Sequence, residues 1–381
     1  MSTIRVNTLQ NTSTTDGGIS INNSGHVTVD GVAMPSSGPL SNRNLIINGA
    51  MQVAQRGTSQ TGITASTYAA CDRFRTIVGG ALGTWTASQD TNAPNGFSNS
   101  FKLTCTSGVA SPATNGIAQV RYYVEAQDLQ SLGFGTADAK STTMSFWVRS
   151  NKTGNASFTI QQRDNSSKQV SFQYSISSAD TWEYKTIAIP ADTSGVINND
   201  NGQGFEITWS INSGTNFSSG SHQSTWGTYA NANINPSNLG VGGATNDYFQ
   251  ITGVQLEVGS VATPFEHRSF GDELARCERY YQIIRSCDGE SYGSSTSLTG
   301  SIHYRTVMRA NPTVEVTGAL RWARPFYGNL TQNSANIGYY DSASASEYGA
   351  LCTFGNFSVF GFTGPLSLND TTNYITASAE L

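Results

Sequence analysis

Charged side chains are scarce in this sequence: they make up 12% of its 381 residues, and the formal net charge is −5. The charges form no long basic or acidic run. Because nucleic-acid binding needs clustered Lys and Arg, the composition gives that function little support, and we expect no nucleic-acid partner. Short runs of branched and aromatic residues alternate with stretches rich in Gly, Ser, Thr and Asn. This pattern favours an all-β protein with a polar but uncharged surface over a disordered chain.

Long apolar runs and ordered cysteine spacings are also missing. No segment approaches the roughly 18 apolar residues of a membrane helix, and the first residues do not resemble a secretory signal, so we expect no membrane insertion. The five cysteines are Cys71, Cys105, Cys277, Cys287 and Cys352. Their odd number and irregular spacing argue against a zinc site or a disulfide framework. Free and mostly packed thiols, made in a reducing cytoplasm, are the better interpretation.

The residues needed for catalysis are few and poorly placed. There are four histidines, and none lies near a Gly-x-Ser-x-Gly motif. A glycosidase needs two carboxylates around the bond that it cleaves. Glu257 and Glu266 flank a chain crossing, but Glu257 alternates with apolar residues and is expected to face away from the core. We therefore predict that the protein is not an enzyme, and a glycan-processing enzyme is the least favoured alternative.

No cofactor is expected. The sequence lacks the paired His or Cys spacing of a metal site, and its Gly-rich run at residues 240–243 lacks the Lys-Ser/Thr of a phosphate loop. Asn246, Asp247 and Asp72 carry hard oxygen atoms that would suit a structural calcium ion. That weaker alternative stays open.

Residues 246–281 organise the rest of the chain. Val254, Leu256 and Val258 alternate with polar residues as in a β-strand, and Gly253 interrupts the run, which suggests a bulge or a close backbone approach. Pro264 then requires an extended crossing. A short amphipathic helix is expected to follow, with Ser269 as its N-cap. This segment separates a long β-rich region from a shorter one.

One face of the predicted helix, which we place at residues 269–284, is apolar. It carries Phe270, Leu274, Cys277 and Tyr281. Such a stripe forms the seam when copies of a helix pack around a common axis, so these four residues are a candidate subunit seam. The alternative is that the stripe packs onto the sheet of its own chain. The helix alone does not decide between the two.

Two regions are predicted to be β-sandwiches, at residues 42–268 and 285–381. Many short strands without intervening helices imply a sandwich or a jelly roll. Residues 141–149 show the expected alternation. One face holds Met144, Phe146 and Val148, and the other holds Ser145 and Trp147.

Residues 1–41 form a separate arm and linker. We expect a short strand and a β-hairpin there, and a segment of this size cannot form a stable core of its own. An exposed hairpin can add strands to another sheet, so sister chains or a docking partner would hold the arm; a mobile tail is less favoured. The apolar positions that would dock are Ile4, Val6, Leu9, Ile19, Ile21, Val27 and Val29.

Motifs along residues 42–314 are familiar when they are taken together. In order they are NLIINGAM, QRG, CDRF, STTMSFWVRSNKTGNASF, DTWEYKTIAIPADTSG, ITGVQLEVGSVATPFEHR, ELARCERYYQ and YRTVMRANPTV. The series resembles bacteriophage tail-fibre proteins that contain a domain like a carbohydrate-binding module. STIRVNTLQNTS at the start resembles the virion-attachment end of marine phage fibres. No single motif is specific, but their order is.

The resemblance implies a homotrimeric fibre of the virion, attached to a tail or adaptor protein through the N-terminal arm. It implies a galactose-binding-like jelly roll at residues 42–268 and a C-terminal receptor-binding tip at 285–381. In such a trimer the helix at 269–284 would lie at the axis, with its apolar stripe as the seam. The tip would bind a glycan or a protein on the host surface. The expected function is host recognition and adsorption, and a head fibre or tail decoration protein without receptor binding is the alternative.

Glycan recognition would use exposed aromatic residues beside polar groups, because sugar rings present C–H faces and hydroxyl edges. Trp209 alternates with core residues and is expected to be buried, and Trp147 and Trp182 are expected to pack within strands. The candidate glycan-binding residues lie in Gly- and Ser-rich stretches or in distal loops: Trp85, Trp226, Trp322, Arg324, Phe326, Tyr327, Tyr339, Tyr340, Asp341 and Tyr348. The alternative for the C-terminal candidates is packing between subunits.

Overall fold

The computed structural model describes residues 8–9, 18–23, 25–34, 41–164, 167–291, 297–317, 320–322, 330–332, 337–338, 349–355, 363–367 and 374–381. The chain divides into two compact units, Met1–Arg268 and Ser269–Leu381. Their regular structure is antiparallel β-sheet with a few short helical segments, which confirms the predicted all-β class. Among the described helices, none combines the length and the apolar character that crossing a membrane requires.

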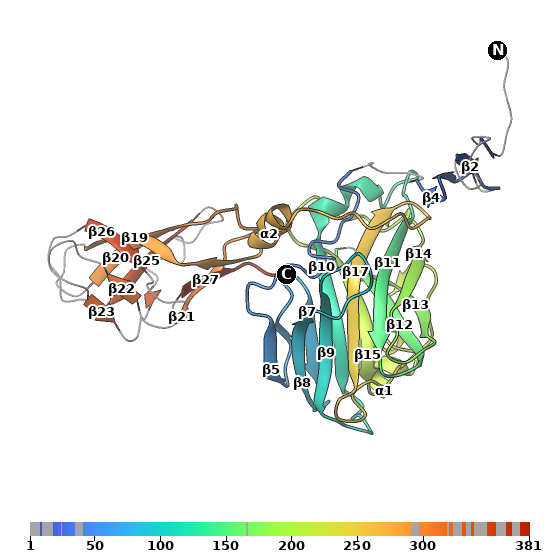
Figure 1. The fold of residues 1–381 in the computed structure, drawn as a ribbon, viewed down its shortest axis with the longest axis horizontal. Helices are drawn as coiled ribbons and strands as arrows, with labels where there is room; N and C mark the ends of the chain where they lie inside the picture. Colours follow the sequence, from blue (N-terminus) through green and yellow to red (C-terminus); the bar gives the residue numbers. More distant parts are fainter. Residues whose placement is uncertain are drawn as a thin grey trace, which may run out of the picture. The chain divides into compact units, whose positions relative to one another are not determined.

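The first unit contains a jelly roll of two antiparallel sheets (Figure 1). Sheet I runs in the order β16 (Gly227–Thr228), β13 (Lys168–Ile176), β12 (Gly154–Gln162), β15 (Gln203–Ser213), β10 (Ile117–Glu125), β7 (Arg75–Gly79) and β6 (Thr67–Tyr68). Sheet II runs in the order β14 (Glu183–Ile189), β11 (Thr142–Ser150), β17 (Tyr248–Val258), β9 (Ser100–Ser107), β8 (Thr84–Asp90) and β5 (Ser59–Ile63). The connections include η1 (Ala126–Leu132), α1 (Thr215–Ser218) and η2 (Asn231–Asn233).

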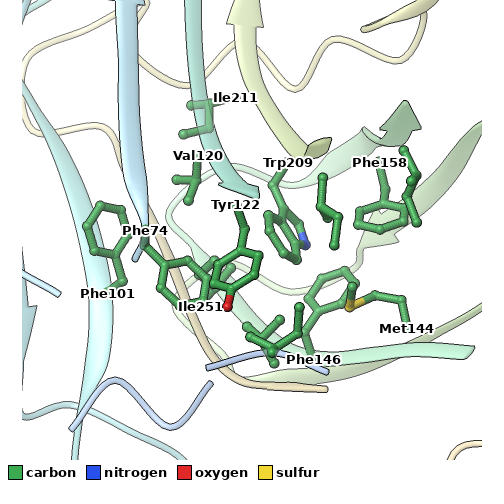
Figure 2. Packing of buried hydrophobic residues seen from close by; sticks show 14 of the residues in the cluster. Phe74, Phe101, Val120, Tyr122, Met144, Phe146, Phe158, Trp209, Ile211 and Ile251 are labelled. Carbon is green, nitrogen blue, oxygen red and sulfur yellow. The ribbon is translucent and has the colours of Figure 1, made fainter. Parts of the chain in front are cut away.

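Alternate residues of both sheets fill the space between them. Trp209 of β15 is fully buried, as predicted, and its ring packs against Phe146 at 5.8 Å and Phe158 at 5.5 Å between centroids. Phe74 and Tyr122 continue the packing at 5.1 Å. Figure 2 shows these rings meeting between the two layers. Because this core takes the inward positions, any ligand of the sandwich must meet the outward positions or the loops.

Three described thiols are buried and form no disulfide bond. Cys71 and Cys105 lie in the jelly-roll unit and Cys277 in the second unit, and all three are buried without a disulfide bond. This agrees with the expectation of packed cysteines outside a disulfide framework at these positions.

Two irregular segments cover parts of the outer faces of the jelly roll. Residues 215–239 lie over sheet I, where Thr159 Oγ1 donates a hydrogen bond to the Ile234 carbonyl oxygen at 3.0 Å. Residues 259–268, the predicted crossing, lie over sheet II. There the Thr263 N–H and hydroxyl groups donate to the buried Glu257 carboxylate at 2.8 and 2.6 Å. Glu257 faces away from the core as expected, but this segment covers it.

Asp192 fastens the loop after β14 to sheet I. Its carboxylate accepts hydrogen bonds from Lys168 Nζ at 2.8 Å, from Gln162 Nε2 at 2.8 Å and from the Ser194 N–H at 3.0 Å. Burial alone would raise the pKa of Asp192, but these donors outweigh it and lower the pKa to about 2. The ionised carboxylate is therefore stabilised in the folded state.

Loss of the Asp192 charge is expected to destabilise the jelly roll in acid. The folded-state pKa lies below the unfolded value of about 3.9, so the contribution, on the order of 2 kcal/mol, is present above pH 4 and is lost as the pH falls towards 2. Asp192→Asn should lower the free energy of unfolding at pH 7 and flatten its dependence on pH between 4 and 2. Urea denaturation across this range measures both effects. Asp138→Asn, at an exposed position, is the matched control, and equal pH profiles for the two variants would contradict the assignment.

The N-terminal arm forms a small sheet of β1 (Thr8–Leu9), β2 (Ile19–Ile21), β3 (Val27–Val29) and β4 (Val32–Ala33), so the predicted hairpin is confirmed. Leu9 lies opposite Ile19, and Ile19 opposite Val29, so these side chains share one face. They are 59%, 41% and 37% exposed, and Ile21 is 44% exposed. The single chain leaves this apolar face open to solvent. Ile4 and Val6 lie outside the described residues.

The second unit begins with α2 (Phe270–Glu278), which Ser269 caps as predicted: its hydroxyl oxygen accepts from the Asp272 N–H at 3.2 Å. The helix ends earlier than expected, because Tyr281 begins β18 (Tyr281–Ile284) and pairs with Ser378. The predicted helix over 269–284 is therefore too long. Cys277 is fully buried and Tyr281 is 8% exposed within their own chain, so the seam prediction is wrong for these two residues. Phe270 is 56% exposed and Leu274 is half-buried, and both stay seam candidates.

Two sheets complete the second unit. One runs in the order β18, β27 (Tyr374–Ser378) and β21 (Thr313–Thr317). The other runs in the order β23 (Leu330–Gln332), β22 (Leu320–Trp322), β26 (Thr363–Ser367), β19 (Ser286–Ser291), β20 (Ser297–His303), β25 (Gly349–Gly355) and β24 (Ile337–Gly338). This unit is thus also β-rich.

Candidate functional site

A half-exposed aromatic platform lies on the outer face of sheet II. Trp147 of β11 lies directly opposite Tyr184 of β14, and their ring centroids are 5.3 Å apart. Tyr184 is 44% exposed and Trp147 is half-buried. Met144, Phe146 and Val148 point into the core from the same strand, so strand alternation turns Trp147 outward. The pair offers ring surface to solvent rather than to the core.

A glycine bulge in β17 makes room for this platform. The pairing of β11 with β17 shifts register between Ser145 and Trp147, and Gly253 has φ +60°. A Cβ atom on Gly253 would stand 2.7 Å from Phe97 Cζ and 3.0 Å from Trp147 Cδ1. Two aromatic rings thus lie over the glycine backbone, and a side chain there would push them apart. The predicted bulge and close approach at Gly253 are both confirmed.

The crossing after β17 adds rings next to the platform. Phe265 packs against Phe97 at 5.0 Å between centroids, and His267 packs against both at 4.9 and 5.3 Å. Phe97 belongs to the loop between β8 and β9, whose Asn92 accepts a hydrogen bond from Trp182 Nε1 at 2.8 Å. The loop and the crossing therefore border the aromatic platform.

A polar row lies next to the platform, two residues further along β11 and β17. Arg149 lies opposite Gln250, which lies opposite Lys102. The Tyr248 ring lies 5.1 Å from Arg149 Cζ and 4.8 Å from Lys102 Nζ. Its hydroxyl group donates to Asp180, and burial together with this bond raises the pKa of Tyr248. Donors and acceptors thus stand close to exposed ring surface.

This arrangement suits binding rather than bond cleavage. Aromatic rings pack against the C–H face of a sugar, and the neighbouring polar groups meet its hydroxyl edges. The two acids that could have formed a catalytic pair have other partners. Glu257 is bound to Thr263, and Glu266 accepts hydrogen bonds from the backbone N–H groups of Asn44 and Arg43. Despite burial, these donors and Arg268 lower the pKa of Glu266, which is the opposite of what a general acid needs.

The two tryptophans predicted to be at the surface of the jelly roll differ in burial. Trp85 is fully buried in β8, and its Nε1 donates to the Leu82 carbonyl oxygen at 2.7 Å. Trp226 packs against Phe205 with ring centroids 5.9 Å apart, and its Nε1 donates to the Pro190 carbonyl oxygen. The prediction is wrong for Trp85, which belongs to the core. Trp226 is half-buried and packs against that core with one side, and its proposed role in glycan binding stays a prediction.

The C-terminal candidates are not placed by the structure. Trp322 lies in β22, but its side chain is not described. The other candidates lie outside the described residues: Arg324, Phe326, Tyr327, Tyr339, Tyr340, Asp341 and Tyr348. Their proposed role in receptor binding stays a prediction.

Asp247 and Asp72, two of the residues considered for calcium, accept hydrogen bonds that hold loops in place. Asp247 accepts from two backbone N–H groups and lies 3.2 Å from Lys152 Nζ, and Asp72 accepts from Gln55 through both its backbone and its side chain. Carboxylates held by N–H donors leave few oxygen lone pairs for calcium. Within the described parts of the chain, no group of three or more His, Cys, Asp or Glu is placed to hold a metal. The calcium alternative gains no support from these two residues.

Sequence reasoning missed the platform itself. Trp147 was expected to pack within its strand, although it alternates with the core residues Phe146 and Val148 and so had to face outward. Its partner Tyr184 carried no local signal, since only the pairing of β11 with β14 brings the two rings together.

Comparisons with known proteins give a fold-level likeness only. No protein-family model matches the sequence, and no curated protein matches it. Among solved structures, the enzymatically active domain of bacteriophage CBA120 tailspike protein 4 is similar at 12% identity and a TM-score of 0.31, covering 57% of this chain and 21% of the tailspike chain. TmCBM61 in complex with β-1,4-galactotriose is similar at 11% identity and a TM-score of 0.27, covering 57% of this chain and 100% of its own. The family 11 carbohydrate-binding module of the cellulase Lic26A-Cel5E of Clostridium thermocellum is similar at 12% identity and a TM-score of 0.26. The match covers 59% of this chain and 97% of the module. Similarity this low says nothing about ligand or activity.

Proposed function

We propose that this protein is a glycan-binding fibre protein of a bacteriophage virion, which recognises the host surface without cleaving it. The observation that carries the proposal is the outward Trp147–Tyr184 pair on sheet II, with 44% of Tyr184 exposed beside a polar row. A large aromatic residue on the outer face of a sandwich is costly to hydrate, and a ligand with C–H faces removes that cost. The jelly roll is the binding module in this proposal.

The fibre part of the proposal rests on the ordered motif series and on two apolar surfaces that the single chain leaves open. One is the N-terminal sheet with Leu9, Ile19 and Val29, which would dock on a tail or adaptor protein or on sister chains. The other is Phe270 at the start of α2, which would lie in a trimer seam. Three copies of a weak site on one fibre, and several fibres on one particle, would add affinity through multivalency.

Binding to purified polysaccharides tests the glycan part directly. The intact chain should bind a subset of host-envelope or capsular polysaccharides on an array and should release no new reducing ends from them. Absence of binding to every polysaccharide by a folded chain would leave a structural virion component as the better explanation. Release of reducing ends would instead show that the protein is a glycan-processing enzyme.

A further inference from the structure

The outer face of sheet I carries two arginines that face each other across neighbouring strands. In the pairing of β10 with β7, Arg121 lies directly opposite Arg75. Arg75 in turn lies opposite Tyr68 of β6. Like charges directly opposite each other destabilise a sheet, and a bound anion would offset that repulsion.

The described residues supply one carboxylate to this group, and it does not serve Arg75. Glu206 of β15 lies 2.9 Å from Arg121 Nη1 and 3.6 Å from Arg163 Nη1. Arg75 lies 5.5 Å from the Tyr68 ring centroid, and its buried Nε has no hydrogen-bond partner. Within the described part of the chain, Arg75 forms no ion pair. Two guanidinium groups thus share one carboxylate, and the third, that of Arg75, has none among the described residues, in a protein whose net charge is −5.

Residues 215–239 cover sheet I over β12, where Thr159 bonds to Ile234. Their Tyr229 also lies near Glu206, Arg121 and Arg163: burial and the charge of Glu206 raise the pKa of Tyr229, and the two arginines act against this. The group is open to a ligand at its Arg75 end. Tyr68, Arg75 and Arg121 lie towards the β6 edge of the sheet and are half-buried rather than covered. The side chain of Arg163 is 40% exposed. An anionic group can therefore approach the exposed parts of these arginines.

The chemistry of these three arginines on sheet I favours a carboxylate carried on a sugar. All three cations are arginines, whose planar N–H forks match the two oxygens of a carboxylate. Arg121 and Arg163 meet at Glu206 and Arg75 lies opposite Arg121, so the three do not form the long basic run that a nucleic-acid backbone needs. The platform on sheet II lacks such an excess of cations, since Arg149 and Lys102 pair there with Asp180 at 3.7 Å and with Asp90 at 3.2 Å.

We infer that Arg75, Arg121 and Arg163 on the outer face of sheet I form a second binding site, which takes the carboxylate of a uronic-acid unit in an acidic polysaccharide. That the anion is carried by a glycan rests on the function proposed above. The anion site itself rests on Arg75, which faces Arg121 without an ion pair of its own among the described residues.

Polygalacturonate and its fully methyl-esterified form test the inference, because they share a backbone and differ in charge. The intact chain should bind the acid form about tenfold more tightly at low salt, and the preference should shrink at high salt. Arg75→Gln should abolish the preference, and Arg75→Lys should keep only part of it because the fork is lost. Arg285→Gln, an exposed position in the second unit, removes the same charge and should change nothing. Equal binding of the two polymers, or an unchanged preference in Arg75→Gln, would overturn the inference.

Two further measurements separate this inference from the proposed function. Without ligand, Arg75→Gln should melt at the same temperature as the wild type or a few degrees above it, because it removes the repulsion with Arg121. Trp147→Ala should retain the preference for the acid polymer. If Trp147→Ala binds neutral glycans normally while the acid preference persists, the platform proposal fails and the anion site stands. Binding of dextran sulfate compared with dextran tests for a general anion site. If the preference for the sulfated polymer equals the preference for polygalacturonate over its ester, the assignment to carboxylate is overturned.

Discussion

Replacing Trp147 by alanine is expected to weaken binding of the recognised polysaccharide by about 30-fold. Truncation of a central aromatic anchor costs on the order of 2 kcal/mol or more, and each 1.4 kcal/mol is about a tenfold change in Kd. Trp147 is central because Tyr184 lies on one side of it and Phe97 and Gly253 lie on the other. Titration calorimetry or surface plasmon resonance with the polysaccharide found on the array measures the change.

Two control variants keep an aromatic ring at each platform position. Trp147→Phe retains a platform and should lose much less affinity, and Tyr184→Phe keeps the ring pair while removing one hydroxyl group. The jelly roll should stay folded in all three variants, because the inward residues Phe146 and Val148 are untouched. Thermal melting followed by circular dichroism checks this. If Trp147→Ala melts normally and binds as tightly as the wild type, sheet II is not the glycan-binding face.

The sandwich could be predicted because its strands carry a two-residue period. Residues 141–149 alternate apolar and polar side chains, and the structure places Phe146 in the core and Ser145 on the outer face as expected. The bulge at Gly253 was also visible, since an isolated glycine in a strand pattern signals a local irregularity. These features depend on neighbours in sequence alone.

The sequence did not show in the same way where Trp85 lies in its sheet. Trp85 stands among Gly, Thr and Ser residues, which suggested a surface loop. β8 instead lies between β5 and β9, and Trp85 pairs with Cys105 and Ile63 on the inward side. The composition of the flanking residues does not report which strands lie on either side. The correct placement needed long-range pairing.

The candidate site depends even more on such pairing. Its rings come from Phe97, Trp147, Tyr184 and Phe265, and the strand order of sheet II brings these distant positions together. The end of α2 has a similar cause. Tyr281 continues the helical spacing, but its pairing with Ser378 draws it into a sheet. Tertiary pairing overrides local periodicity where a short helix gains little from its own propensity.

Phe270→Asp is expected to convert a trimer into monomers. The wild-type chain should have a solution mass three times the 40.6 kDa of one chain, as measured by light scattering. Phe270 is the apolar residue of the predicted seam that is mainly exposed, at 56%, so it adds little to the core of its own unit. Three Asp residues near a common axis would repel one another in an apolar contact. The substitution leaves the isolated unit folded, because an acidic residue in the first turn of a helix interacts favourably with the helix dipole.

This choice of position separates assembly from folding. Leu274→Asp would also disrupt a seam, but Leu274 is half-buried in its own chain, so unfolding could produce the same result. Ala275→Asp introduces the same charge at an exposed position off the stripe and should leave the mass at three chains. Phe270→Leu keeps an apolar contact and should also stay trimeric. If the wild-type chain is monomeric, or if Phe270→Asp remains trimeric, α2 is not at the trimer axis. In the second case, the exposed apolar face of Leu9, Ile19 and Val29 becomes the surface to alter next.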